Sequence, residues 1–304
     1  MDTRNSLLGI AYTIAAAACF SVLDTTVQYL SSFVPLLMAL WWRYTFQTVV
    51  AAAMLAPQRG LRMLRTQRPG LHVMRGITLM CSTAFAFASL KVMPVSEFTA
   101  VVMITPLAIT LVAATALKQH VSGLRWALVI VSFLATMVII RPFGSGFHIT
   151  LLLPLGCVVG NVAFQLLTSR MTLTEDTMTM QLSTGLVGMV LASIALPFVF
   201  VWFTDWKLWA LLLLMGVSSS VGHFLLIKAF QKAAPATLMP YQYAQIAFAL
   251  LGGWLVFRYV PDQLSMLGMT VIALCGALGA WLTVHEGRAA RVNAAAVATS
   301  AAAL

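Results

Sequence analysis

The sequence predicts an all-α polytopic membrane protein, with ten transmembrane helices arranged as two inverted five-helix repeats. Three observations predict this fold class. The 304 residues are 61% hydrophobic and only 9% charged, which lies far outside the usage of soluble globular proteins. Long apolar runs recur along the whole chain instead of forming a single anchor. The first and second halves of the chain have similar hydropathy when they are aligned at a constant offset.

Ten apolar runs are long enough to cross a bilayer as helices, which requires about 20 residues each. We expect the spans at 7–30, 34–56, 71–91, 95–117, 122–140, 150–169, 177–203, 207–230, 236–257 and 263–283. The first run is longer than the apolar region of a cleaved signal peptide, so it predicts an uncleaved span. The linkers are short, and none is long enough to hold a soluble domain.

The basic residues predict the orientation of the spans. An even number of spans puts both termini on one side of the membrane. Of the 18 Lys and Arg residues, all but Arg43, Lys91, Arg141, Lys207 and Arg258 fall on that side. Because basic residues concentrate in cytoplasmic loops, we expect both termini in the cytoplasm. The formal charge of +10 then reflects helix orientation, and we expect no nucleic-acid partner.

The internal similarity predicts the domain organisation. Gly76 corresponds to Gly216, and Thr78 to Ser218, at an offset of 140 residues. Five spans is an odd number, so the second repeat must enter the membrane from the opposite side. Such inverted repeats place a substrate site near the midplane, at the repeat interface. We expect the first repeat at 1–143, the second at 144–284 and a disordered cytoplasmic tail at 285–304.

Two charges interrupt the first two spans, Asp24 and Arg43. An ionised group at membrane depth costs several kcal/mol unless it is paired or hydrated. The turn at 31–33 is so short that we expect the two spans to be antiparallel neighbours. Asp24 then lies about 9 Å and Arg43 about 13 Å from that turn, at similar depth. Two interpretations stay open: a structural ion pair that locks the helices, or a polar binding site that also includes Gln47.

Further polar side chains occur inside later spans. Asn161 and Gln165 are one turn apart in span six, and Tyr241 and Gln245 share a helix face in span nine. Pro106 and Pro240 each remove a backbone hydrogen bond, which predicts a kink or a wetted carbonyl. The candidate substrate-binding residues are Asp24, Arg43, Tyr44, Gln47, Asn161, Gln165, His223, Tyr241, Gln242 and Gln245.

More specific roles can be assigned to three of these candidates and to Glu97. Asp24 and Glu97 are the candidates for coupling, although a first-turn acid such as Glu97 is also favoured by the helix dipole. His223 is either a proton carrier or a hydrogen-bonding residue between helices. Tyr44 is placed beside Arg43, where its ring could stack on a ligand.

Several function classes lack support in the sequence. No GxxxxGK[ST] or HExxH motif occurs, and the cysteines Cys19, Cys81, Cys157 and Cys275 show no metal-binding spacing. We therefore expect no enzymatic activity, no ATP-driven motor, no metal and no cofactor. Pairs of small residues, such as Gly185 with Gly188 and Gly276 with Gly279, could pack helices within the fold or between the protomers of a homodimer.

These residues resemble the drug/metabolite transporter superfamily, in particular its EamA-type members with ten spans. The resemblance covers about residues 7–283. Its carriers are Phe20-Ser21 with Asp24, Arg43, Arg75-Gly76, Met93-Pro94-Val95-Ser96, Thr105-Pro106-Leu107 and Ile139-Ile140-Arg141-Pro142. The stretch 71–76 is most similar to the branch that includes S-adenosylmethionine uptake carriers. The family often ends spans four and nine with Gly-Glu, whereas this chain has Lys118-Gln119-His120 and Phe257-Arg258-Tyr259.

The resemblance implies a secondary active transporter that moves a small polar or zwitterionic metabolite across the cytoplasmic (inner) membrane of a bacterium by alternating access. An amino acid, S-adenosylmethionine or a similar cofactor-like solute fits that class. The alternatives are an exporter of amino acids or toxic metabolites in the same superfamily, and a channel or structural membrane subunit that transports nothing.

Overall fold

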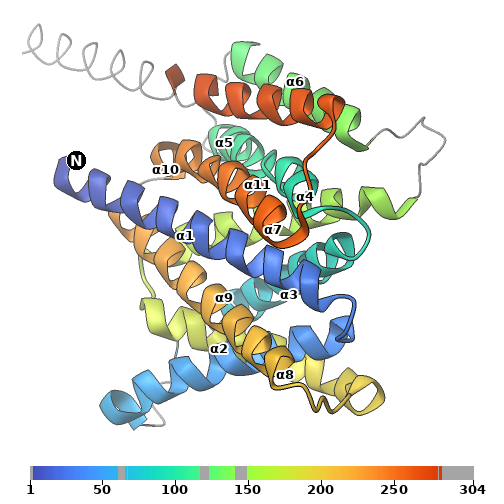
Figure 1. The fold of residues 1–304 in the computed structure, drawn as a ribbon. Coiled ribbons are helices and arrows are strands. Elements are labelled where there is room, and N and C mark those ends of the chain that lie inside the picture. The colour runs from blue at the N-terminus through green and yellow to red at the C-terminus, as the bar shows by residue number, and fades with distance from the viewer. Residues whose placement is uncertain are drawn as a thin grey trace, which may run out of the picture.

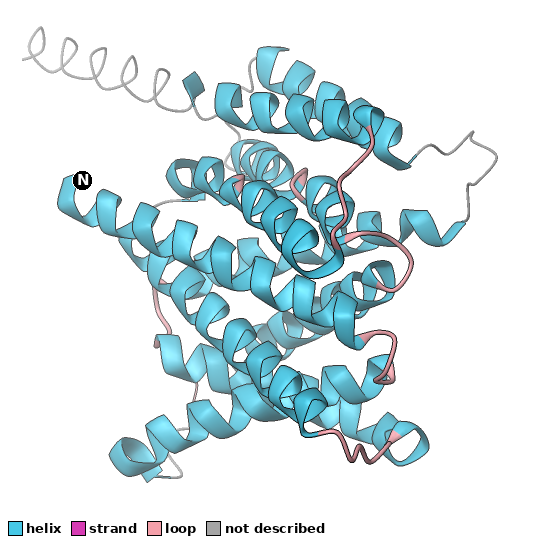
Figure 2. Cartoon of the chain, in the orientation of Figure 1, coloured by secondary structure: helices cyan, strands magenta, loops and turns pink. Residues whose placement is uncertain are grey.

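The computed structural model describes residues 3–60, 66, 68–116, 123–140, 149–233, 235–279 and 281–282. Helices account for nearly all of these residues, and none of them forms a strand (Figures 1 and 2). The helices are α1 (Thr3–Leu30), α2 (Leu36–Arg59), α3 (Pro69–Leu90), α4 (Val95–Val102), α5 (Thr105–Ala116), α6 (Gly123–Ile140), the 3₁₀ helix η2 (Ile149–Leu152), α7 (Leu153–Met171), α8 (Thr177–Val199), α9 (Trp206–Lys232), α10 (Pro235–Gln242), α11 (Ala244–Phe257) and a last helix, Gln263–Gly279.

The described helices overlap the predicted spans, and their ends differ from the predicted ends by a few residues. Four of them are long and apolar enough to cross a membrane by length and composition: Asn5–Leu30, Pro69–Leu90, Thr177–Val199 and Trp206–Lys232. Shorter apolar helices occupy Val95–Ile109, Trp126–Ile139, Ala244–Phe257 and Gln263–Gly279. The remaining two predicted spans coincide with α2 and α7. The prediction of an all-α polytopic membrane protein is confirmed, whereas the tail at 285–304 lies outside the described residues.

The fourth and ninth predicted spans are each broken into two helices. The first break falls at Met103–Ile104, between α4 and α5, and the second at Tyr243, between α10 and α11. Pro106 has no N–H to donate to the carbonyl of Val102, so a continuous helix would lose a bond here. Instead Ile104 N donates to Val101 O at 3.1 Å, and Ile246 N donates to Tyr243 O at 3.1 Å. The two breaks lie at positions 103 and 243, so they obey the offset of the sequence repeat.

Helices pack across the two halves of the chain. The first helix of each half lies against the third helix of the other, α1 on α9 and α7 on α3, while α2 lies on α8. Figure 1 shows α1 and α9 crossing the front of the molecule together, with α2 and α8 at the end opposite α6 and the last helix. The hydrophobic core therefore lies between the halves.

One expectation about neighbouring helices is wrong. We expected the spans 7–30 and 34–56 to pack directly on each other, but α1 and α2 make no extensive contact. Glycines explain which partners they take instead. A Cβ added at Gly222 of α9 would lie 2.8 Å from Phe20 Cε1, and one added at Gly188 of α8 would lie 2.7 Å from Tyr44 Cδ2. Only glycine permits such close approach, so α1 is drawn to α9 and α2 to α8.

The small-residue pairs noted in the sequence pack helices inside the fold. Gly185 and Gly188 lie against Thr48 and Tyr44 of α2, and Gly276 lies against the ring of Tyr243. These contacts account for the glycines without a second protomer, and the homodimer stays a prediction.

Candidate functional site

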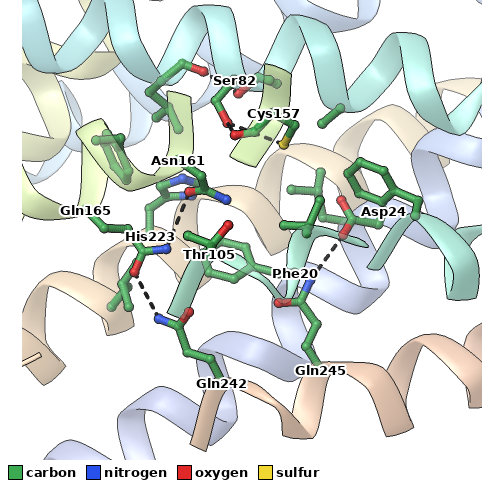
Figure 3. Close-up of a pocket in the computed structure, with 18 of the residues that line it drawn as sticks. Phe20, Asp24, Ser82, Thr105, Cys157, Asn161, Gln165, His223, Gln242 and Gln245 are labelled. Carbon is green, nitrogen blue, oxygen red and sulfur yellow. Dashed lines mark hydrogen bonds between the residues drawn. The ribbon is translucent and has the colours of Figure 1, made fainter. Parts of the chain in front are cut away.

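A cavity of about 90 Å³ lies where the long helices of both halves meet the two helix breaks (Figure 3). It is lined by Phe20, Leu23, Asp24, Arg43, Leu79, Ser82, Thr83, Ala86, Phe87, Phe98, Val102, Met103, Thr105, Cys157, Asn161, Phe164, Gln165, His223, Leu226, Gln242 and Gln245. A typical small-molecule pocket holds about 300–1,000 Å³. In this conformation the cavity is therefore smaller than a typical small-molecule site.

Asp24 brings the negative charge of this cavity. It lies one helical turn after Phe20 on α1, and both residues line the cavity together with Leu23. The side chain is buried, and its Oδ2 accepts a hydrogen bond from Gln245 Nε2 of α11 at 3.2 Å. Figure 3 shows this contact across the cavity from the amide side chains of α7.

Arg43 brings the positive charge and is held from two helices of the bundle. Its Nε donates to Ser219 Oγ of α9 at 2.6 Å, and its Nη1 donates to Thr83 Oγ1 of α3 at 2.8 Å. Tyr44 OH also donates to Thr83 Oγ1, at 3.1 Å, and the guanidinium lies 4.7 Å from the centre of the Tyr44 ring. Hydroxyls and an aromatic ring thus fix the position of this cation without neutralising its charge.

The two charges do not pair with each other. Among the described residues, Asp24 and Arg43 form no ion pair, although both line the same cavity. The structural ion pair that would lock the first two helices is therefore absent from this conformation. Each charged side chain is hydrogen-bonded only to neutral groups. A bound solute with a positive and a negative group would therefore supply a counter-charge to both.

Amide side chains form a second polar wall. Gln242 Nε2 of α10 donates to Gln165 Oε1 at 3.1 Å, and Gln165 Nε2 approaches Asn161 Oδ1 at 3.5 Å. This row of hydrogen-bonded amides extends from α7 of the second half to the break between α10 and α11 (Figure 3). Because amides both donate and accept, this wall can reorganise around a ligand without leaving a group unpaired.

His223 of α9 lies between two aromatic rings of the cavity wall. Its Nδ1 lies 2.9 Å from Ser219 O, and the rings of Phe20 and Phe164 approach it edge-on at 4.9 and 5.6 Å. A backbone carbonyl can only accept, so Nδ1 carries the hydrogen and a neutral His223 keeps a lone pair on Nε2. This arrangement makes His223 an acceptor in the cavity wall.

Four predicted site residues lie outside the cavity lining. Tyr44 is buried behind Arg43, and Gln47 donates through Nε2 to the carbonyl of Gln181 at 2.9 Å. Tyr241, just before the break at Tyr243, is 38% exposed, whereas its neighbour Gln242 lines the cavity together with Gln245. Glu97 accepts hydrogen bonds from Tyr259 OH and Ser265 Oγ at 2.5 and 3.2 Å, at the start of α4.

Sequence reasoning did not select several Ser and Thr hydroxyl groups of the site. Thr83 and Ser219 hold Arg43, while Ser82 lies 3.5 Å from the sulfur of Cys157 in the cavity wall. Thr105 Oγ1, at the first helix break, is buried and has no hydrogen-bond partner within the described chain. The Ser218–Ser220 run inside an apolar span was the available signal for one of them.

No metal centre is visible in the part of the chain that the structure describes, where no three His, Cys, Asp or Glu side chains gather to hold an ion. The polar groups of the cavity suit hydrogen bonding to an organic solute.

Known proteins resemble this chain in sequence and fold. Residues 7–141 match the EamA-like transporter family. A riboflavin transporter of Rhizobium johnstonii is 28% identical over 281 residues, which cover 90% of each chain. An S-adenosylmethionine uptake transporter of Rickettsia prowazekii is 24% identical over 272 residues, covering 88% of this chain and 91% of the relative. A pseudopaline exporter of Pseudomonas aeruginosa is 24% identical over 278 residues, covering 89% and 95%.

A solved crystal structure has the same fold. It matches with a TM-score of 0.67 and 16% identity, over 94% of this chain and 99% of the other. At this identity the likeness shows the fold alone. The resemblance to EamA-type carriers, including the branch with S-adenosylmethionine uptake carriers, is confirmed by the family match and the relatives together.

Proposed function

We propose that the chain, whose residues 7–141 match the EamA-like transporter family, is a secondary active transporter of a small zwitterionic metabolite in a bacterial cytoplasmic membrane. The observation that carries this proposal is the pair of opposite charges in one cavity. Asp24 and Arg43 are both buried, line the same cavity and remain unpaired with each other. Buried charges are costly unless they find partners, and a carboxylate and an ammonium on one solute supply both partners.

The charges also discriminate between the solutes that the relatives carry. S-adenosylmethionine has a carboxylate for Arg43, whose planar fork suits it, and an ammonium for Asp24. Riboflavin has neither group, so its binding would leave both charges without counterions. We therefore take S-adenosylmethionine as the first probe and riboflavin as the contrasting one.

The proposed mechanism is alternating access between two inverted repeats, 1–143 and 144–284. The repeated helix order supports it, since α4 begins at residue 95 and α10 at 235, and both predicted spans are broken at the same repeat position. A cavity of about 90 Å³ cannot admit such a solute until the halves move apart. Asp24 holds the substrate ammonium, or carries a coupling proton in its absence.

The proposed topology has both termini in the cytoplasm. A reporter fused after residue 304 should read cytoplasmic, and one inserted at Gly144, which lies outside the described residues, should read external. A cytoplasmic reading at Gly144 would overturn both the span count and the inverted repeat.

Proteoliposomes separate a carrier from a channel or a structural subunit. With purified protein and radiolabelled S-adenosylmethionine, a carrier shows saturable uptake that is stimulated by unlabelled solute inside, which is counterflow. A channel shows neither saturation nor counterflow. The exporter alternative rests on the pseudopaline relative, and net flux in cells that express the protein decides the direction.

A further inference from the structure

Arg75 of α3 is a fully buried cation that the proposed binding site does not use. Its Nε donates to Thr168 Oγ1 of α7 at 2.8 Å, and its Nη1 donates to Met180 O of α8 at 2.9 Å and also to Thr184 Oγ1. No carboxylate pairs with it in the described part of the chain, and Nη2 has no hydrogen-bond partner there. An Arg kept at this cost is expected to have a role beyond packing.

The contacts of Arg75 join the two halves at one end of the bundle. They connect the beginning of α3, from the first half, to the end of α7 and the beginning of α8, from the second. One turn before Arg75, His72 Nε2 lies 3.4 Å from Glu175 Oε2 in the connection between α7 and α8. The proposed topology places this end at the cytoplasmic side.

Phe164 separates Arg75 from the cavity. The guanidinium carbon of Arg75 lies 4.6 Å from the centre of the Phe164 ring, and this ring also lines the cavity and meets His223 edge-on. Phe164 is 1% exposed. Arg75 therefore packs against an aromatic side chain that forms part of the cavity wall.

A second polar contact joins the halves at the opposite end. Glu97, at the beginning of α4, accepts from Tyr259 OH at 2.5 Å and from Ser265 Oγ at 3.2 Å. Both donors belong to the second half, after the end of α11. The neighbouring Phe98 is buried and lines the cavity, as Phe164 does at the other end.

We propose that Arg75 and Glu97 are positioning residues that latch the two opposite ends of the cavity, with Phe164 and Phe98 as the closures they hold. This inference rests on the proposed transport function. Release of the Arg75 latch opens the cavity to the side where α3 begins, and release of the Glu97 latch opens it to the other side.

Cys157 provides a native reporter, because it lines the cavity and is buried. The test uses a background in which Cys19, Cys81 and Cys275 are alanine, reconstituted in vesicles of known orientation. A charged, membrane-impermeant methanethiosulfonate is added from one side at a time, and the labelling rate of Cys157 is measured by mass spectrometry. The variants are Arg75→Met and Glu97→Met. Thr168 and Thr184 keep their own backbone acceptors, Phe164 O and Met180 O, so Arg75→Met orphans few groups.

Loss of hydrogen bonds to a charged group shifts a two-state equilibrium by about tenfold or more. We expect Arg75→Met to accelerate labelling by about that factor from the side where α3 begins, and Glu97→Met to do so from the opposite side only. Acceleration of both variants from the same side, or from both sides, would overturn the proposal, and so would unchanged rates in folded variants.

Two milder variants test the same proposal if Arg75→Met does not fold. Thr184→Val removes one acceptor of the latch and should give a smaller acceleration from the same side, and Arg75→Lys should give an intermediate rate because it keeps the charge without the planar fork. The labelling assay needs no transported solute, so its result can be interpreted even if the uptake experiment fails. If the topology is the reverse of the proposed one, the two variants should still be labelled faster from opposite sides of the membrane.

Discussion

Thr83→Val tests how Arg43 is held in the cavity. The Thr83 hydroxyl accepts from Arg43 Nη1 at 2.8 Å and from Tyr44 OH at 3.1 Å, and it donates to its own helix at Leu79 O. Valine keeps the shape and removes both acceptor contacts, so Arg43 keeps its hydrogen bond to Ser219 and its contact with the Tyr44 ring. A hydrogen bond to a charged group contributes about 1.5–3 kcal/mol. We expect a loss of about 1–3 kcal/mol in the free energy of unfolding.

The ligand assay gives the functional part of this prediction. Because Arg43 is then less well placed, the apparent Kd for S-adenosylmethionine, measured from ligand-induced thermal stabilisation, should rise about tenfold. Thr136→Val is the matched control, since Thr136 is also buried and, among the described residues, its hydroxyl donates to Ser132 O of its own helix alone. Equal Kd values for the two variants would refute the assignment of Arg43 to the ligand.

Two further predictions concern packing and the cavity lining. Gly188→Ala should lower the free energy of unfolding by about 1–3 kcal/mol, because the new methyl group meets the Tyr44 ring, whereas Gly70→Ala enters open space and should leave the melting temperature unchanged. In a background without other reactive cysteines, Gln242→Cys and Gln245→Cys should be labelled by a small aqueous thiol reagent and protected by S-adenosylmethionine. Tyr241→Cys should be labelled without protection, and equal protection at all three positions would contradict the observed lining.

The helices could be predicted because each span carries its own signal in apolar length. The partners of the helices could not, since hydropathy does not say which face meets which. The small residues Gly222 and Gly188 decide those partners through contacts with Phe20 and Tyr44, and these contacts join positions far apart in the chain.

The charged and amide groups of the site could be recognised because they are rare inside apolar spans. The Ser and Thr residues of the site could not be distinguished in this way from those that serve only their own helix. Thr13 and Thr48 donate to carbonyls of their own helices, as Thr83 also does, and only tertiary structure adds Arg43 to Thr83. A continuous helix would put Tyr241 on one face with Gln245, whereas the helix is interrupted at Tyr243 and the cavity is lined by Gln242 and Gln245.

The central claim is that the transported solute pairs its ammonium with Asp24 and its carboxylate with Arg43. Its most direct test is the uptake of radiolabelled S-adenosylmethionine by proteoliposomes that contain wild-type protein or Asp24→Asn, measured across pH. Asparagine keeps the size and the hydrogen bonding of Asp24 but removes its charge and its titration. We predict normal expression and folding, with transport lost or no longer dependent on pH. Transport within about twofold of wild type, with the same pH dependence, would contradict the claim.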